Sequence, residues 1–198
     1  MIYSSILRNW IQKTGKAGPV LAAVTIMVLY THFIMGEKSK CYVDILPPGL
    51  VILDVKVGYD VQYVQDLFTA LGERGLECYY EMVTIWDNIF PLVYGWLYFS
   101  LFSLVFKNRL LHRKKILYLF LFPALAPLSD WVENFLEAQL IRHFWSQGVV
   151  DSSLVWAASL AGQIKWFLSV LVILLFLFGF TWMAVNFIQE RMKIRKKQ

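Results

Sequence analysis

The run from Trp166 to Ile188 contains no charged residue, and this feature most limits what the chain can become. An apolar helix of this length matches the hydrocarbon thickness of a bilayer. Composition agrees, because 58% of the 198 residues are hydrophobic and 17% are aromatic, which is unusual for a soluble domain. We therefore predict an integral membrane protein.

Three further apolar segments support a multi-pass arrangement. The first follows a basic N-terminal lead that is similar to a signal peptide, but it has no small-residue cleavage site, so we interpret it as a retained span. The prediction is one membrane domain, 1–198, with transmembrane helices at about residues 19–35, 85–106, 116–136 and 164–188.

The basic residues indicate how these spans are oriented. The net charge is +5, and 13 of the 19 basic residues form three clusters that alternate with the predicted spans. These clusters are Arg8, Lys13 and Lys16; Lys107, Arg109, Arg113, Lys114 and Lys115; and Arg191, Lys193, Arg195, Lys196 and Lys197. This is the positive-inside pattern and not a phosphate-binding groove, so we expect no nucleic-acid partner. Both termini are predicted to be cytoplasmic, with a bacterial inner membrane as the expected location.

The segment 37–84, between the first two spans, is predicted to be an extracytoplasmic helical cap. Pro47-Pro48-Gly49 indicates a turn, residues 50–57 favour an extended piece, and a helix follows with Asp60 as N-cap and Gly72 as its end. Its expected buried face comprises Val61, Val64, Leu67, Phe68 and Leu71. The predicted fold class is therefore an all-α membrane protein, a four-transmembrane-helix bundle with this cap.

Both cysteines, Cys41 and Cys78, fall in the same outer segment. An oxidising compartment would favour a disulfide between them, whereas two free thiols are the alternative. The spacing alone does not decide between these states.

Acidic residues mark a candidate site in the outer half of the membrane. Counting from the cytoplasmic ends at 1.5 Å per residue, Asp87 reaches roughly 30 Å, Asp130 roughly 22 Å and Glu133 roughly 27 Å. Asn134 and His32 reach roughly 28 Å and 24 Å by the same rise. Ionisable groups near membrane depth are costly, so they indicate function by default.

Helical periodicity places these groups on facing stripes. Asp130 and Asn134 share one face with Pro127 and Glu137, while Asp87, Pro91, Tyr94 and Tyr98 share another. Pro91 lacks the N–H that would bond the carbonyl of Asp87, so we expect a bend at this acid. The predicted ligand-binding residues of an outward-facing pocket are Asp87, Tyr94, Asp130, Glu133, Asn134 and His32.

Plainer interpretations remain for each of these residues. The acids of the third span are alternatively a solvated helix end, and Asp87 is alternatively an N-cap. His32 suits simple packing, and Tyr94 suits an interfacial aromatic. Lys165 is expected either to extend towards the interface or to pair with one of the acids.

Other site chemistries lack sequence support. A cluster of acids with a histidine can bind a divalent metal, but no metal-ligand spacing of the HExxH or paired-cysteine type is present. Nucleophile motifs and glycine-rich phosphate loops are also absent from the sequence. We therefore predict no metal and no cofactor.

Two motifs resemble those of a group of small uncharacterised bacterial four-helix membrane proteins. They are D-x-x-F-P-x-x-Y, from Asp87 to Tyr94, and D-x-x-E-N, from Asp130 to Asn134, within a similarity over residues 54–137. This resemblance implies that the motifs act together, and it implies no activity. A weaker similarity of layout alone links the chain to emopamil-binding-protein-like sterol isomerases.

These observations favour a membrane protein that binds a lipid or amphiphile in the acidic pocket. One alternative is an enzyme that modifies such a lipid, with Asp87 and Asp130 as the catalytic acid–base pair. Another is a non-catalytic subunit whose acidic stripe pairs with a second membrane protein. Ion or proton conduction is a third alternative, and it would require oligomerisation because four spans are few.

Overall fold

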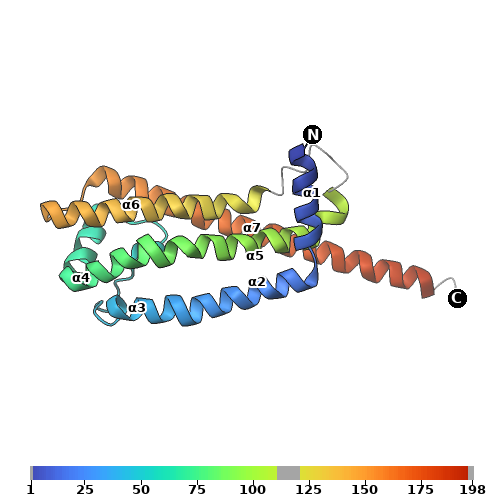
Figure 1. Cartoon of the computed structure of the whole chain (residues 1–198), viewed down its shortest axis with the longest axis horizontal. Coiled ribbons are helices and arrows are strands. Elements are labelled where there is room, and N and C mark those ends of the chain that lie inside the picture. Colours follow the sequence, from blue (N-terminus) through green and yellow to red (C-terminus); the bar gives the residue numbers. More distant parts are fainter. Residues whose placement is uncertain (1, 111–120, 196–198) are drawn as a thin grey trace.

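A computed structural model describes residues 2–110 and 121–195, and within these ranges the chain forms helices and no strand. Figure 1 shows long helical rods running side by side, with α1 (Ile2–Thr14) lying across them towards one end. The start of the third predicted span, 116–136, falls partly on residues 111–120, which lie outside the described residues.

Three helices in the described part of the chain are long and apolar enough to cross a membrane, and they confirm the predicted membrane character. They cover Ala17–Val43, Val61–Lys107 and Ser152–Gln189. The first comprises α2 (Ala17–Leu29), the π-helical turn η1 (Tyr30–Met35) and α3 (Gly36–Val43). The second comprises α4 (Val61–Glu81), the π-helical turn η3 (Met82–Trp86) and most of α5 (Asp87–Leu110), while the third lies in α7 (Ser152–Arg195).

Another long helix, α6 (Leu125–Gln147), forms an antiparallel hairpin with α7. It ends at Gly148, whose left-handed φ of 72° suits glycine at a helix C-terminus. Asp151 then caps α7, because its carboxylate accepts hydrogen bonds from the backbone N–H groups of Ser153 and Leu154 at 2.8 and 2.9 Å. These two bonds stabilise the ionised carboxylate and lower the pKa of Asp151. The short connection fixes α6 against α7.

The region between the first two predicted spans, residues 37–84, is mostly helical. Both flanking helices continue into it, and the loop between α3 and α4 holds only a short 3-10 turn, η2 (Leu53–Val55), where an extended piece was expected. Asp60 caps α4 as predicted, accepting from the Tyr63 N–H at 2.8 Å. Gly72 does not end the helix but kinks it, with φ 60° and ψ −173°. The helix resumes because the residues that follow, up to Tyr79, also have a face to bury.

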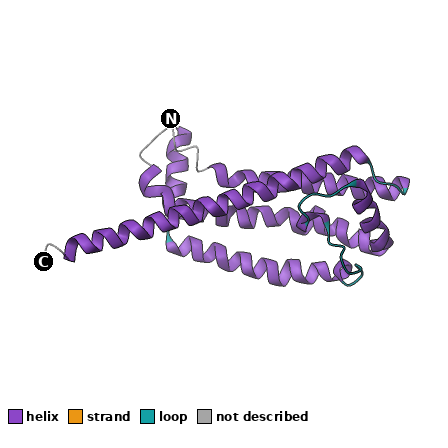
Figure 2. Cartoon of the chain, turned by 180° about the vertical axis from the view of Figure 1, so that it is seen from behind, coloured by secondary structure: helices purple, strands orange, loops and turns teal. Residues whose placement is uncertain are grey.

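The kinked part of α4 packs over α6 and α7. Val64, Leu67, Phe68 and Leu71 are buried as predicted, whereas Val61 is 41% exposed. Their apolar cluster includes residues of α6 and α7, namely Leu140, Ile141, Val155 and Ala158. Seen from behind, the loop between α3 and α4 lies at the same end of the bundle, away from the C-terminus (Figure 2).

A disulfide joins α3 to α4 at this end, between Cys41 and Cys78, whose Cα atoms are 6.2 Å apart. At the opposite end, Ile11 of α1 packs with Phe102, Val105 and Phe106 of α5. Lys107 donates a hydrogen bond to the carbonyl of Gly15 in the same region. Each end of the bundle therefore has its own apolar cluster, and the polar residues described next lie between them.

Candidate functional site

The polar layer is assembled from three helices and one turn. Asp87 begins α5, Lys165 lies on α7, and Asp54 lies on η2. From α6 come Asp130, Glu133, Asn134 and Glu137, all of them buried. Their spacing along α6 places them on one side of that helix, which faces its neighbours in the bundle.

A π-helical turn and a proline position Asp87. Pro91 has no N–H for the carbonyl of Asp87, and the Asn134 side chain of α6 donates to that carbonyl instead, at 3.2 Å. The backbone carbonyls of the residues on either side of Asp87 also accept hydrogen bonds from side chains. Tyr30 donates to the carbonyl of Trp86 at 2.6 Å, and Trp131 donates to that of Asn88 at 2.9 Å. Three consecutive carbonyls, of Trp86 in η3 and of Asp87 and Asn88 in α5, thus bond to side chains of η1 and α6.

Lys165 is the cationic centre of the layer. Its ammonium lies 2.6 Å from a Glu133 oxygen and 3.3 Å from an Asp130 oxygen, and it also forms an ion pair with Asp54. The residue is 7% exposed. The sequence left two roles open for Lys165, and the structure places it among the acids.

Tyrosine hydroxyls supply donors to two of the acids. Tyr94 donates to Asp130 at 2.9 Å, and Tyr79 donates to Glu137 at 2.5 Å while accepting from the backbone N–H of Leu53. Tyr59 is buried beside Glu137. Burial and the nearby carboxylates raise the pKa of Tyr59 well above its ordinary value, so its hydroxyl stays protonated.

A glycine makes room for Glu133. A Cβ added at Gly162 of α7 would collide with the carboxylate of Glu133, which is completely buried. The absence of a side chain at Gly162 therefore lets α6 and α7 approach with an acid between them. Ser129 strengthens this contact by donating to the carbonyl of Ala161 at 2.9 Å.

A cavity of about 280 Å³ adjoins the layer, on the face of α5 between α2 and α7. Its polar end is formed by Asp54, Tyr94, Asp130 and Lys165. The remaining walls are almost entirely apolar and aromatic: Met27, Val55, Phe90, Tyr98, Trp166, Ser169, Val170 and Ile173. The cavity is thus amphipathic, with ionised groups at one end and hydrocarbon along the rest.

The structure brings most of the candidate residues together. Asp87, Tyr94, Asp130, Glu133 and Asn134 all contribute to the layer or to the cavity beside it. His32 does not, because it is exposed on η1, where its ring packs edge-on against Phe33. The depth predicted for His32 in the membrane matched the depths predicted for the acids. However, depth along a helix does not determine which way a side chain faces.

Asp54 and Tyr79 belong to the layer but were not among the candidates. The available signal for Asp54 is that it is the one acid within an apolar stretch, LVILDVKV. Tyr79 precedes the bend near Asp87 and gives no comparable signal. Its role depends on the packing of α4 against α6, which brings its hydroxyl to Glu137.

No family model, curated protein or solved structure gives a significant match to this chain. The function therefore has to be argued from the polar layer and the cavity themselves.

Proposed function

We propose that this protein is a multi-pass membrane protein that binds a lipid or similar amphiphile in an outward-facing pocket between α2, α5 and α7. The apolar part of the ligand occupies the cavity, and its polar head lies against Lys165, Asp54 and Asp130. The single observation that supports this proposal best is the amphipathic lining of the cavity. Ligand pockets are typically apolar with a few polar groups that fix orientation.

The residues that line the cavity indicate how the ligand's polar head and apolar tail are oriented in it. Val170 and Ile173 lie on α7 beyond Trp166, and the charged groups occur only at the Lys165 end. A hydrocarbon chain gains about 25 cal/mol per Å² of apolar surface that it buries, so the tail is favoured along these residues. Hydroxyl or ammonium heads suit the opposite end, where the carboxylates outnumber the single ammonium.

The four-span topology is part of the same proposal. Four spans, with α6 as the third, place the basic clusters and both termini in the cytoplasm, and they place residues 37–84 outside as a cap. The Cys41–Cys78 disulfide supports this orientation, because such bonds persist in oxidising compartments. A bacterial inner membrane, with the cap in the periplasm, fits both arguments.

The acid–base alternative has weaker support than binding. A catalytic acid or base has to reach the bound substrate directly or through one water. Asp130 lines the cavity, but Asp87 is not among the residues that line it. The geometry therefore favours a binding function over catalysis by this pair.

Native mass spectrometry of detergent-extracted protein tests the proposal. Ser169→Trp fills the cavity, whereas Leu174→Trp adds the same indole to an exposed position of α7 that does not line it. We expect wild type and Leu174→Trp to retain a lipid-sized mass, and Ser169→Trp to lose at least ~10-fold of that occupancy, as expected when a ligand is excluded sterically.

Equal retention by the two variants would contradict the proposal, as would a wild-type protein that carries no lipid. If wild type instead co-purifies with a second protein, and Ser169→Trp does not alter that association, the subunit interpretation replaces lipid binding.

A further inference from the structure

We propose that Asp54, Asp87 and Asp130 bind one divalent cation, of the hard class that includes Ca²⁺, Mg²⁺ and Mn²⁺. This inference goes beyond lipid binding and does not depend on it. Asp54 and Asp130 also line the cavity, whereas Asp87 does not.

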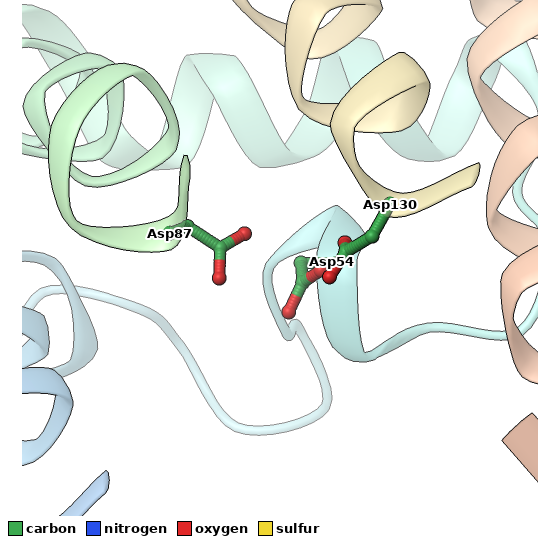
Figure 3. A group of neighbouring side chains, drawn as sticks. All are labelled: Asp54, Asp87 and Asp130. Atoms are coloured by element: carbon green, nitrogen blue, oxygen red, sulfur yellow. The ribbon is translucent and has the colours of Figure 1, made fainter. Parts of the chain in front are cut away.

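The three carboxylates converge at a distance suited to a metal. One oxygen from each lies within 4.8 Å of the others. Figure 3 shows Asp87 extending from α5 towards the carboxylates of Asp54 and Asp130, which arrive from η2 and α6. Ca²⁺–oxygen distances of about 2.3–2.6 Å put two opposite ligand atoms about 4.6–5.2 Å apart, so the separation fits one shared ion.

Asp87 supplies an independent indication that something binds there. The residue is 2% exposed, and none of the described residues donates a hydrogen bond to either of its buried carboxylate oxygens. Buried charges are normally paired or coordinate a metal, because an isolated one is costly. Asp87 is held in place through its backbone carbonyl, so its side chain is free to act as a ligand.

The charge balance of the layer also calls for a cation. Asp54, Asp87, Asp130, Glu133 and Glu137 supply five carboxyl groups, and Lys165 is the one ammonium placed among them in the described structure. Lys165 pairs with Asp54, Asp130 and Glu133, and Tyr79 donates to Glu137, so Asp87 is the acid of this set to which none of the described residues donates. A divalent ion between the three aspartates supplies the positive partner that the Asp87 carboxylate lacks.

The donor set determines the class of metal. All three ligands are carboxylate oxygens, which suit Mg²⁺, Ca²⁺ and Mn²⁺, whereas thiolate and imidazole ligands favour zinc or copper. Asn134 offers a fourth oxygen, since it is fully buried and its Oδ1 accepts no hydrogen bond from the described residues. Asn134 also bonds the backbone of Asp87, so it lies next to the site.

Mn²⁺ binding to the full-length protein tests the inference. The protein is stripped of lipid and metal in detergent with chelator, and bound Mn²⁺ is then measured by electron paramagnetic resonance and by elemental analysis. We expect one Mn²⁺ per chain, displaced by Ca²⁺ or Mg²⁺, and at least ~10-fold weaker binding by Asp87→Asn, because a ligating carboxylate is lost. Lipid is absent from this measurement, so its outcome is separate from that of the lipid-binding test.

Glu137→Gln is the matched control, because it also neutralises a fully buried acid of the layer but lies outside the three aspartates. Its Mn²⁺ affinity should stay within twofold of wild type. If Asp87→Asn does not fold, Asp54→Asn on the η2 turn tests the same site. Absence of Mn²⁺ binding in wild type would overturn the inference in favour of a proton on Asp87, and so would an equal loss in Glu137→Gln.

Discussion

Glu137 and Asp87 occupy two regions of one polar layer, and their surroundings differ sharply. Glu137 lies where α4 packs on α6, with the hydroxyl of Tyr79 at 2.5 Å and Tyr59 beside it. Asp87 lies at the bend of α5, where none of the described residues donates to its carboxylate. Both side chains are almost completely buried.

The difference separates a structural acid from a candidate ligand. A buried carboxylate with donors contributes to packing and specificity, whereas one without donors carries the full cost of desolvation until something binds it. Burial alone therefore does not identify a site. The distribution of donors does, and it indicates the Asp87 region.

Lys165→Met is the change with the largest expected effect, because it would leave Glu133 without a donor, as Asp87 is, and would leave Asp130 with Tyr94 alone. It removes the ammonium from two buried carboxylates and from Asp54, and breaking such a pair costs about 3–5 kcal/mol. The free energy of unfolding, measured by titration with SDS in mixed micelles, checks this. Lys40→Met, which removes an exposed pair with Glu37, should leave it unchanged. Equal losses in the two variants would contradict a central role for Lys165.

Tyr79→Phe probes the Glu137 region and should have an intermediate effect. It leaves the Glu137 carboxylate without its closest donor and the Leu53 N–H without an acceptor, at a cost of about 1–3 kcal/mol. Tyr94→Phe is the matched change on the other side, and it should cost less because Asp130 keeps Lys165. The same SDS titration compares them. The reverse order would show that the two regions do not differ as described.

Asp87→Asn, measured in chelator, should have the smallest effect on stability and is the sharpest test of the comparison. It removes a buried charge that has no donor, and its new amide can donate to Asp54 or Asp130, so we expect no loss or a slight gain. Glu137→Gln should lose about 1 kcal/mol, because it weakens a charge-assisted hydrogen bond. Added Mn²⁺ should stabilise wild type and not Asp87→Asn. A large loss for Asp87→Asn in chelator would show that its carboxylate has a partner.

Local sequence rules explain the parts of the fold that could be predicted. Long apolar runs predict membrane helices because a bilayer leaves few alternatives, and Pro91 predicts a freed carbonyl at Asp87 because proline has no N–H. Helical spacing placed Asp130, Asn134 and Glu137 on one face of that helix, and in the structure all three are buried.

The remaining features depend on contacts between distant segments. The sequence marks Gly72 as a helix end, but the helix resumes because the residues after it also have apolar neighbours. Asp54 joins the layer only because the loop before α4 folds back to Lys165, more than a hundred residues later in the chain. The exposure of His32 likewise follows from the rotation of η1, which depth along a helix does not determine.

Because of the π-helical turn η3, the number of residues between α4 and α5 helps to determine the geometry of the site. Such a turn holds more residues than a regular α-helical turn, so it sets the rotational phase between α4 before it and α5 after it. If the same residues formed a regular α-helix instead, the rest of α5 would be rotated relative to α4 by about 100°, the angle of one residue. Asp87 and Tyr94 would then turn away from α6 although their identities were unchanged. In this bend, the spacing of the residues is as much a determinant as their chemistry.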